Sequence, residues 1–219
     1  MRHNQMSESI PVGLLLAFAG GMLDSYSYLN RGQVFATAET GNLVLLGLQL
    51  AQQNWAGILH YLLPILSFAA GVLATELLRR WMGPNAGRLH WRQPILLTEC
   101  LVLVVVALIP SGPLDSVSNM LISFTSAIQI ESFRQFHGCG CATTMCTGNL
   151  RSGTEHLFRC LTTPGSHSAS KAMLYYSLIL SFVAGAVSCG LISSFLGCRA
   201  VLVACLPLLA AFLVMFQGI

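Results

Sequence analysis

Residues 24–43 read DSYSYLNRGQVFATAETGNL, and residues 131–150 read ESFRQFHGCGCATTMCTGNL. The second stretch lies over the first at an offset of 107 residues without a gap, and six of the twenty positions are identical. Four of those six form the run Thr-Gly-Asn-Leu, at 40–43 and again at 147–150. One Thr-Gly-Asn (TGN) tripeptide is a weak signal, but two of them in a collinear repeat indicate a chain built from two related halves.

The repeat continues beyond these stretches. Ser-Phe-x-Ala-Gly occurs at 67–71 and again at 181–185, after an insertion of seven residues. Each half therefore has the same order: an acid-bearing apolar segment, a TGN segment, a segment with Ser-Phe-x-Ala-Gly, and a last aliphatic segment. We predict one integral membrane domain made of two membrane repeats, residues 1–110 and 111–219.

The composition predicts a membrane protein. Of the 219 residues, 54% are hydrophobic and only 9% are charged, whereas soluble domains are about a quarter charged. The net charge of +3 is too small and too scattered for nucleic-acid binding, so nucleic acid is excluded as a partner. Several of the eight cysteines lie inside apolar runs, where they act as small apolar side chains and not as a disulfide framework. The expected partner is the lipid bilayer.

Six segments are candidate spans, because a spanning helix needs about 20 largely apolar residues. They are residues 11–29, 58–78, 94–110, 116–136, 172–196 and 200–216. The fourth is the most polar of the six. The run 12–23 resembles the apolar core of a signal peptide, but cleavage there would leave the following repeat without its span, so we expect it to be retained.

Three spans in each half predict that the second half is inverted relative to the first. Cytoplasmic loops are enriched in Lys and Arg. The loop 79–93 holds four arginines, whereas the equivalent loop after Leu196 holds one. The loop 52–57 holds no basic residue, whereas its partner 150–171 holds three. With both termini cytoplasmic, eight of the eleven basic residues lie on one side, and we expect a bacterial inner-membrane protein of this topology.

The TGN segments 33–51 and 139–159 are then expected to be re-entrant. Each begins with small, β-branched or aromatic residues that suit an extended segment, and a helix is predicted to start at TGN with Thr40 or Thr147 as its N-cap. Irregular backbone at membrane depth is tolerated only where it is buried in protein or lines a wet cavity. The sequence therefore predicts a polar cavity near the membrane midplane.

Asp24 and Glu131 are equivalent carboxylates inside predicted spans. Such a group costs roughly 2.5–3.5 kcal/mol on insertion scales, so it usually faces a cavity or a partner. We expect both to face the cavity and to carry a proton. Two simpler interpretations stay open, in which Asp24 caps a helix break near the interface and Glu131 pairs with Arg134. Glu99 is an acid inside an otherwise aliphatic span. The sequence does not decide whether its side chain faces the cavity or reaches the membrane interface.

The two TGN tripeptides are expected to contact a ligand. A helix that begins inside the membrane directs free N–H groups and its positive dipole end toward the cavity, which suits an anionic group. The alternative is a buried turn whose side chains satisfy only backbone groups. The full predicted solute-binding set is Asp24, Tyr28, Thr40, Gly41, Asn42, Gln129, Glu131, Thr147, Gly148 and Asn149.

A metal site is the weaker interpretation of a polar cluster in the second half. The cluster consists of one imidazole and three thiols, which are side chains that bind zinc: His137, Cys139, Cys141 and Cys146. The equivalent first-half positions hold no thiol or imidazole, and they are Asn30, Gly32, Val34 and Glu39. We therefore expect packing residues, with no metal and no cofactor.

No enzyme motif is present. The sequence lacks a nucleophile elbow, a P-loop, an HExxH and paired CxxC motifs. Asp24 and Glu131 could form an acid pair for intramembrane proteolysis, but Gly-Gly-Met-Leu-Asp (residues 20–24) is not the Gly-x-Gly-Asp context of that chemistry. We expect a protein that is not an enzyme.

The run GGMLDSYSYLNRGQVFATAETGNLVLLG (residues 20–47), with SAIQIESFRQFHGCGCATTMCTGNL (126–150), resembles the YoaK-like family of uncharacterised bacterial multi-pass membrane proteins. The likeness covers nearly the whole chain. It implies a bacterial inner membrane and no particular activity, so the function is inferred from the residues themselves.

The favoured function is a small-solute transporter with a midplane site between two inverted repeats, proton-coupled and taking an anionic or polar solute. The small size of one chain makes a homodimer plausible. The alternative is a non-transporting membrane component for assembly or signalling.

Overall fold

The computed structural model describes residues 8–82, 92–136, 139–140, 143–163 and 168–216. Most of these residues are helical, which agrees with the predicted all-α membrane protein. The helices are α1 Ile10–Asn30, α2 Glu39–Ala51, α3 Trp55–Met82, α4 Arg92–Leu108, α5 Asp115–Ser132, α6 Cys146–Thr162, α7 Ser168–Leu196, the 3-10 helix η3 Gly197–Ala204 and α8 Cys205–Phe216. Two short antiparallel strands, β1 Gln135–Phe136 and β2 Cys139–Gly140, lie between α5 and α6.

Long apolar helices form where the sequence has uninterrupted aliphatic runs. Among the described residues, three helical stretches are long and apolar enough to cross a membrane: Ile10–Asn30, Trp55–Trp81 and Ser168–Phe216. Large apolar side chains cover the outside of these helices, such as Leu73 on α3 and Phe195 on α7, which are 64% and 89% exposed. A soluble protein rarely exposes so much apolar surface, so this surface is suited to lipid.

Two details of the predicted segments are wrong. Helix α5 ends at Ser132 and the chain then enters β1, so the predicted span 116–136 is too long at its polar end. The helices of the two TGN segments begin at Glu39 and Cys146, and their N-cap residues are Ala38 and Met145. Thr40 and Thr147 therefore lie inside the first helical turn and are not N-caps.

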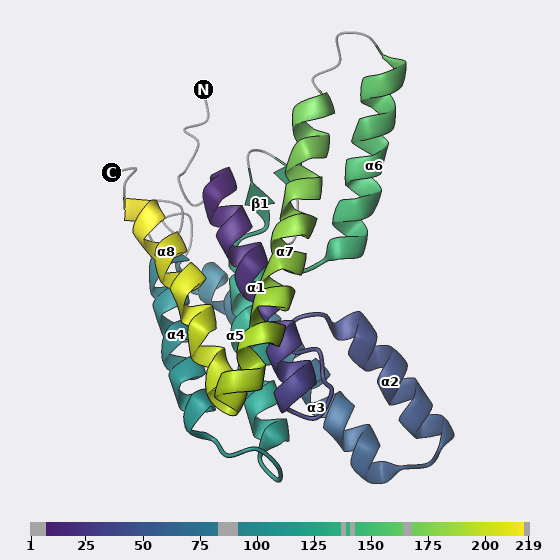
Figure 1. The fold of residues 1–219 in the computed structure, drawn as a ribbon, viewed down its shortest axis with the longest axis vertical. Helices are drawn as coiled ribbons and strands as arrows, with labels where there is room; N and C mark the ends of the chain where they lie inside the picture. Colours follow the sequence, from purple (N-terminus) through teal and green to yellow (C-terminus); the bar gives the residue numbers. More distant parts are fainter. Residues whose placement is uncertain (1–7, 83–91, 137–138, 141–142, 164–167, 217–219) are drawn as a thin grey trace.

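The helices form two packed pairs that share a bundle (Figure 1). Helix α1 packs along α7, and α3 packs along α5. Helices α4 and α8 contact each other and complete the bundle, α4 against α5 and α8 against α1. Helix α2 packs on α3 and α6 packs on α7, and Figure 1 shows α6 at the upper end and α2 at the lower end of the molecule.

Glycines allow the paired helices to approach closely. A Cβ atom added to Gly21 of α1 would lie 1.9 Å from the carbonyl oxygen of Phe182 on α7. One added to Gly185 of α7 would lie 2.0 Å from the carbonyl oxygen of Phe18, and one added to Gly71 of α3 would lie 2.5 Å from that of Phe124. Small residues at such crossings let membrane helices make backbone contact.

Arg31, directly after α1, ties the end of α1 to the end of α4 and to the start of α5. Its side chain is fully buried and donates to the carbonyl oxygens of Val106, Ile109 and Pro110 at 2.8–3.2 Å. It also donates to Asp115 Oδ1 at 3.0 Å. A guanidinium at a helix C-terminus satisfies carbonyls that have no partner in the helix and matches the negative end of the dipole.

Candidate functional site

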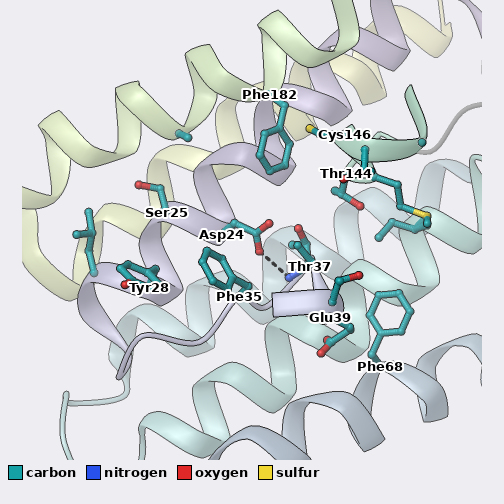
Figure 2. A pocket seen from close by; sticks show the side chains of 18 residues that line it. Asp24, Ser25, Tyr28, Phe35, Thr37, Glu39, Phe68, Thr144, Cys146 and Phe182 are labelled. Atoms are coloured by element: carbon teal, nitrogen blue, oxygen red, sulfur yellow. Dashed lines mark hydrogen bonds between the residues drawn. The ribbon is translucent and has the colours of Figure 1, made fainter. Parts of the chain in front are cut away.

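A cavity of about 620 Å³ lies where α2 and α6 begin. Helices α1, α3, α5 and α7 and the non-helical residues before α2 and α6 supply the rest of its wall, so both halves of the chain contribute (Figure 2). Five pairs of residues that the repeat makes equivalent line it from both sides. They are Thr37 and Thr144, Ala38 and Met145, Glu39 and Cys146, Thr40 and Thr147, and Phe68 and Phe182.

The cavity forms here because the chain is not helical directly before α2 and directly before α6. Residues 31–38 and 143–145 are not helical, and each then enters the first turn of α2 or α6. The first-turn residues Glu39 and Thr40 line the cavity on one side, with Cys146, Thr147 and Gly148 on the other. Two helix N-termini therefore border one cavity.

Asp24 enters the cavity from α1 (Figure 2). It is only 4% exposed, and its Oδ1 accepts a hydrogen bond from the backbone N–H of Thr37 at 2.8 Å. Its Oδ2 is buried and has no hydrogen-bond partner among the described residues. A carboxylate oxygen left in this condition is costly unless the group takes a proton or contacts a ligand.

Glu39 is a second carboxylate of the cavity, and the sequence analysis did not select it. Its Oε2 accepts from Asn42 Nδ2 at 2.8 Å, whereas no described residue bonds its buried Oε1. The hydroxyls of Thr37 and Thr144 also line the cavity and are buried without a partner in the described part of the chain. Four polar side chains with unmet hydrogen-bonding capacity thus border one space.

Four aromatic rings also border the cavity, from Tyr28, Phe35, Phe68 and Phe182. The rings of Tyr28 and Phe35 are stacked with their centroids 5.0 Å apart. Figure 2 places Tyr28 and Phe35 on one side of Asp24, with Phe68 and Phe182 on other parts of the wall. The wall therefore combines polar groups with flat apolar surfaces.

The predicted solute-binding residues divide into two groups. Five of them line the cavity: Asp24, Tyr28, Thr40, Thr147 and Gly148. The other five do not: Gly41, Asn42, Gln129, Glu131 and Asn149.

Asn42 and Gly41 shape the cavity from behind. The Asn42 amide accepts from the backbone N–H of Phe35 at 2.9 Å and donates to the carbonyl of Phe35 at 2.6 Å. It thereby fastens the extended segment to α2. A Cβ atom on Gly41 would lie 2.6 Å from the Phe35 ring, so glycine leaves the room that this ring occupies.

Glu131 lies among charged side chains and not in the cavity. Arg79 donates to Glu131 Oε1 at 3.4 Å and to its backbone carbonyl at 2.9 Å, and Arg134 forms an ion pair with it. This is the simpler interpretation that the sequence left open, extended by an arginine from α3. Gln129 of α5 donates to Glu99 Oε2 of α4 at 2.9 Å, and both residues are buried.

The residues of the metal alternative are only partly described. His137 and Cys141 lie outside the described residues. Cys139 belongs to β2, and Cys146 lines the cavity beside Thr147. Within the described ranges, no three potential ligands gather into a group that could hold a metal ion.

Comparison with known proteins agrees with this membrane architecture. A relative in Bacillus subtilis (strain 168), the "UPF0700 transmembrane protein YoaK", is 28% identical over 151 residues. That match covers 65% of this chain and 64% of the relative, so it spans less than two thirds of the relative's length. No solved structure matches the chain.

The resemblance to the YoaK-like family is thereby confirmed, and a family match extends it along the sequence. Residues 12–214 match the family described as "Protein of unknown function (DUF1275)". This range includes all of α2 to α7 and nearly all of α1 and α8, and with them the whole described cavity wall. The chain is a membrane protein that belongs to the DUF1275 family.

Proposed function

We propose that the chain is a small-solute transporter of the bacterial inner membrane, with six spans, both termini cytoplasmic and two inverted repeats that meet at the cavity. The observation that carries the proposal is the cavity itself. It lies between two interrupted segments in matching positions of the halves, and it holds buried carboxylate oxygens without partners. Secondary transporters place their midplane sites in this way.

Equivalent contacts support the relation between the halves. Ser67 Oγ on α3 donates to the Met120 carbonyl on α5 at 2.8 Å, and Ser181 Oγ on α7 donates to the Leu14 carbonyl on α1 at 2.7 Å. Ser67 and Ser181 are equivalent in the repeat, and Met120 lies within one residue of the equivalent of Leu14. Each serine thus joins its own half to the other half through an equivalent pair of helices, as a twofold relation between the halves requires.

The two ends of the molecule support an inverted arrangement. The α2 helix and the α6 helix project near opposite ends of the bundle (Figure 1). Parallel halves related by an axis along the membrane normal would carry both at one end. Alternating access would then rock one helix pair, α1 with α7, against the other, α3 with α5, around the cavity.

Asp24 is the residue that would couple solute movement to a proton. It is the cavity carboxylate that enters from a span long enough to cross a membrane. Its Oδ2 is buried without a hydrogen-bond partner among the described residues, and its Oδ1 holds the Thr37 backbone at the entry to α2. Loss or gain of one proton at Asp24 would therefore act on the solute and on the re-entrant segment together.

Topology is the first test. A sided reporter is fused after Asn54, between α2 and α3, and separately after Thr163, which follows α6. Inverted halves place these two sites on opposite sides of the membrane, with Thr163 cytoplasmic. If both reporters face the same side, the inverted repeat is wrong and the transporter proposal loses its main support.

Flux is the second test. The purified chain is reconstituted into liposomes with an internal pH dye, and a panel of small amines, zwitterions and carboxylates is added outside. A transported solute moves protons in the wild-type chain, and Asp24→Asn abolishes that movement. The matched control is Glu155→Gln, an acid on α6 whose side chain is 50% exposed and pairs with Arg159. Asp24→Asn that leaves every flux unchanged but alters abundance or partner binding would favour the non-transporting component.

A further inference from the structure

The charge of the cavity wall has one sign. Two carboxylates, Asp24 and Glu39, line it, and no Lys or Arg occurs among its described lining residues. Asp24 Oδ2 and Glu39 Oε1 are both buried without a described hydrogen-bond partner. Among the described lining residues, an anionic solute would meet two acids and no basic side chain.

The helix starts do not reverse that balance. The N-terminus of a helix attracts an anion, but in α2 that position is already taken by Glu39 in the first turn. The positive end of the α2 dipole therefore stabilises a protein carboxylate. Only the start of α6, with Cys146 and Thr147, is left for a ligand anion.

The aromatic rings fit a cation and offer little to a strongly hydrated anion. Tyr28, Phe35, Phe68 and Phe182 present ring surfaces to the same space as the two acids. The face of an aromatic ring carries negative charge density and attracts organic cations, most strongly where water is excluded. A volume of about 620 Å³ suits a drug-sized ligand, which usually occupies a pocket of about 300–1,000 Å³.

We infer that the solute of this cavity is an organic cation with apolar substituents, such as a substituted amine or a quaternary ammonium compound. Asp24 and Glu39 neutralise its charge, and the aromatic wall holds its apolar groups. This deepens the proposed function, on which it rests, and it replaces the anionic or polar solute of the sequence argument with a cationic one. A proton on Asp24 and a cation beside it would exclude each other, which gives exchange of one for the other.

Binding to the purified full-length chain tests this inference without requiring transport. Tetraphenylphosphonium and tetraphenylborate have nearly the same shape and opposite charge. Each is measured by equilibrium dialysis against the chain in detergent, with empty micelles as the blank. The expected result is saturable binding of tetraphenylphosphonium that unlabelled tetraethylammonium displaces, with no saturable binding of tetraphenylborate.

Variants locate the binding in the cavity. Asp24→Asn and Glu39→Gln are each expected to weaken tetraphenylphosphonium binding at least about 10-fold, which corresponds to 1.4 kcal/mol. Phe68→Leu is expected to weaken it about 2- to 30-fold through the lost cation–π contact. Glu155→Gln, outside the cavity, is expected to keep the wild-type affinity. Glu39→Gln and the displacement by tetraethylammonium keep the test valid if Asp24→Asn does not fold.

Two binding results overturn the inference: tetraphenylborate binding as tightly as tetraphenylphosphonium, or cation binding that none of the cavity variants changes. The outcome for transport is separate. Cavity-dependent cation binding without any flux in liposomes would keep the inference and refute the transporter, whereas flux of carboxylates that depends on Asp24 would keep the transporter and refute the cation.

Discussion

Replacing Gly185 by alanine is expected to separate α7 from α1. The new Cβ would lie 2.0 Å from the Phe18 carbonyl oxygen, whereas ordinary contact begins at 3.4 Å, so the backbones must move apart by roughly 1.4 Å. Overpacking of a close interface costs about 1–3 kcal/mol. The separation also strains the 2.7 Å hydrogen bond from Ser181 to Leu14, and such membrane hydrogen bonds are worth about 0.6 kcal/mol on average. We expect a loss of about 2–4 kcal/mol.

The assay is the thermal unfolding midpoint of the purified chain in detergent, read by fluorescence-detected size exclusion. Gly71→Ala, the repeat equivalent on α3, places a Cβ 2.5 Å from the Phe124 carbonyl and is expected to lower the midpoint less. Gly47→Ala is the matched control, because a Cβ there meets nothing within 4 Å and alanine favours a helix. A Gly185→Ala midpoint equal to that of Gly47→Ala would refute the close approach of α1 and α7.

Two further changes test the supports of the site. Arg31→Met leaves three carbonyls and Asp115 Oδ1 without the guanidinium donor. Removing one partner of a buried ion pair costs about 3–5 kcal/mol. The thermal midpoint should therefore fall well below that of the control Arg151→Met, which changes an exposed residue of α6. Asn42→Leu removes both bonds to the Phe35 backbone, and we expect faster protease cleavage within 31–38, with the rest of the chain resisting as in wild type. Unchanged cleavage would show that Asn42 does not hold this segment.

The helical framework was predictable because its signal is local. Aliphatic runs at residues 58–78 and 172–196 exceed the length that a span needs, and both are helical in the structure. The repeat gave the order of the elements in both halves. The helix starts were misplaced by the assumption of a threonine cap, whereas the residues at the caps are Ala38 and Met145, whose side chains make no cap hydrogen bond.

The cavity residues were less predictable, since tertiary contacts decide which acids face it. Glu131 has a visible sequence neighbour in Arg134, but its second partner, Arg79, lies 52 residues away and comes from another helix. Glu39 was overlooked because the repeat comparison weights positions that match, and its equivalent is Cys146. The relevant signal was an acid at the first position of a helix inside an apolar chain.

The two halves contribute similar apolar and hydroxyl side chains to the cavity but different charged side chains. Equivalent threonines and phenylalanines line both sides of the cavity, so the scaffold is common to both halves. The acids are not, because Asp24 and Glu39 enter the cavity, whereas their equivalents are an arginine-paired Glu131 and Cys146. A symmetric site would present the same charge to the solute in the inward-facing and the outward-facing state of an alternating-access cycle. In this site both acids come from the first half, but Asp24 lies on α1 and Glu39 on α2, which packs on α3. In the proposed transporter, rocking of α1 with α7 against α3 with α5 would therefore move the two acids relative to each other. A bound cation that contacts both acids in one state would lose contact with one of them as the cavity changes sides.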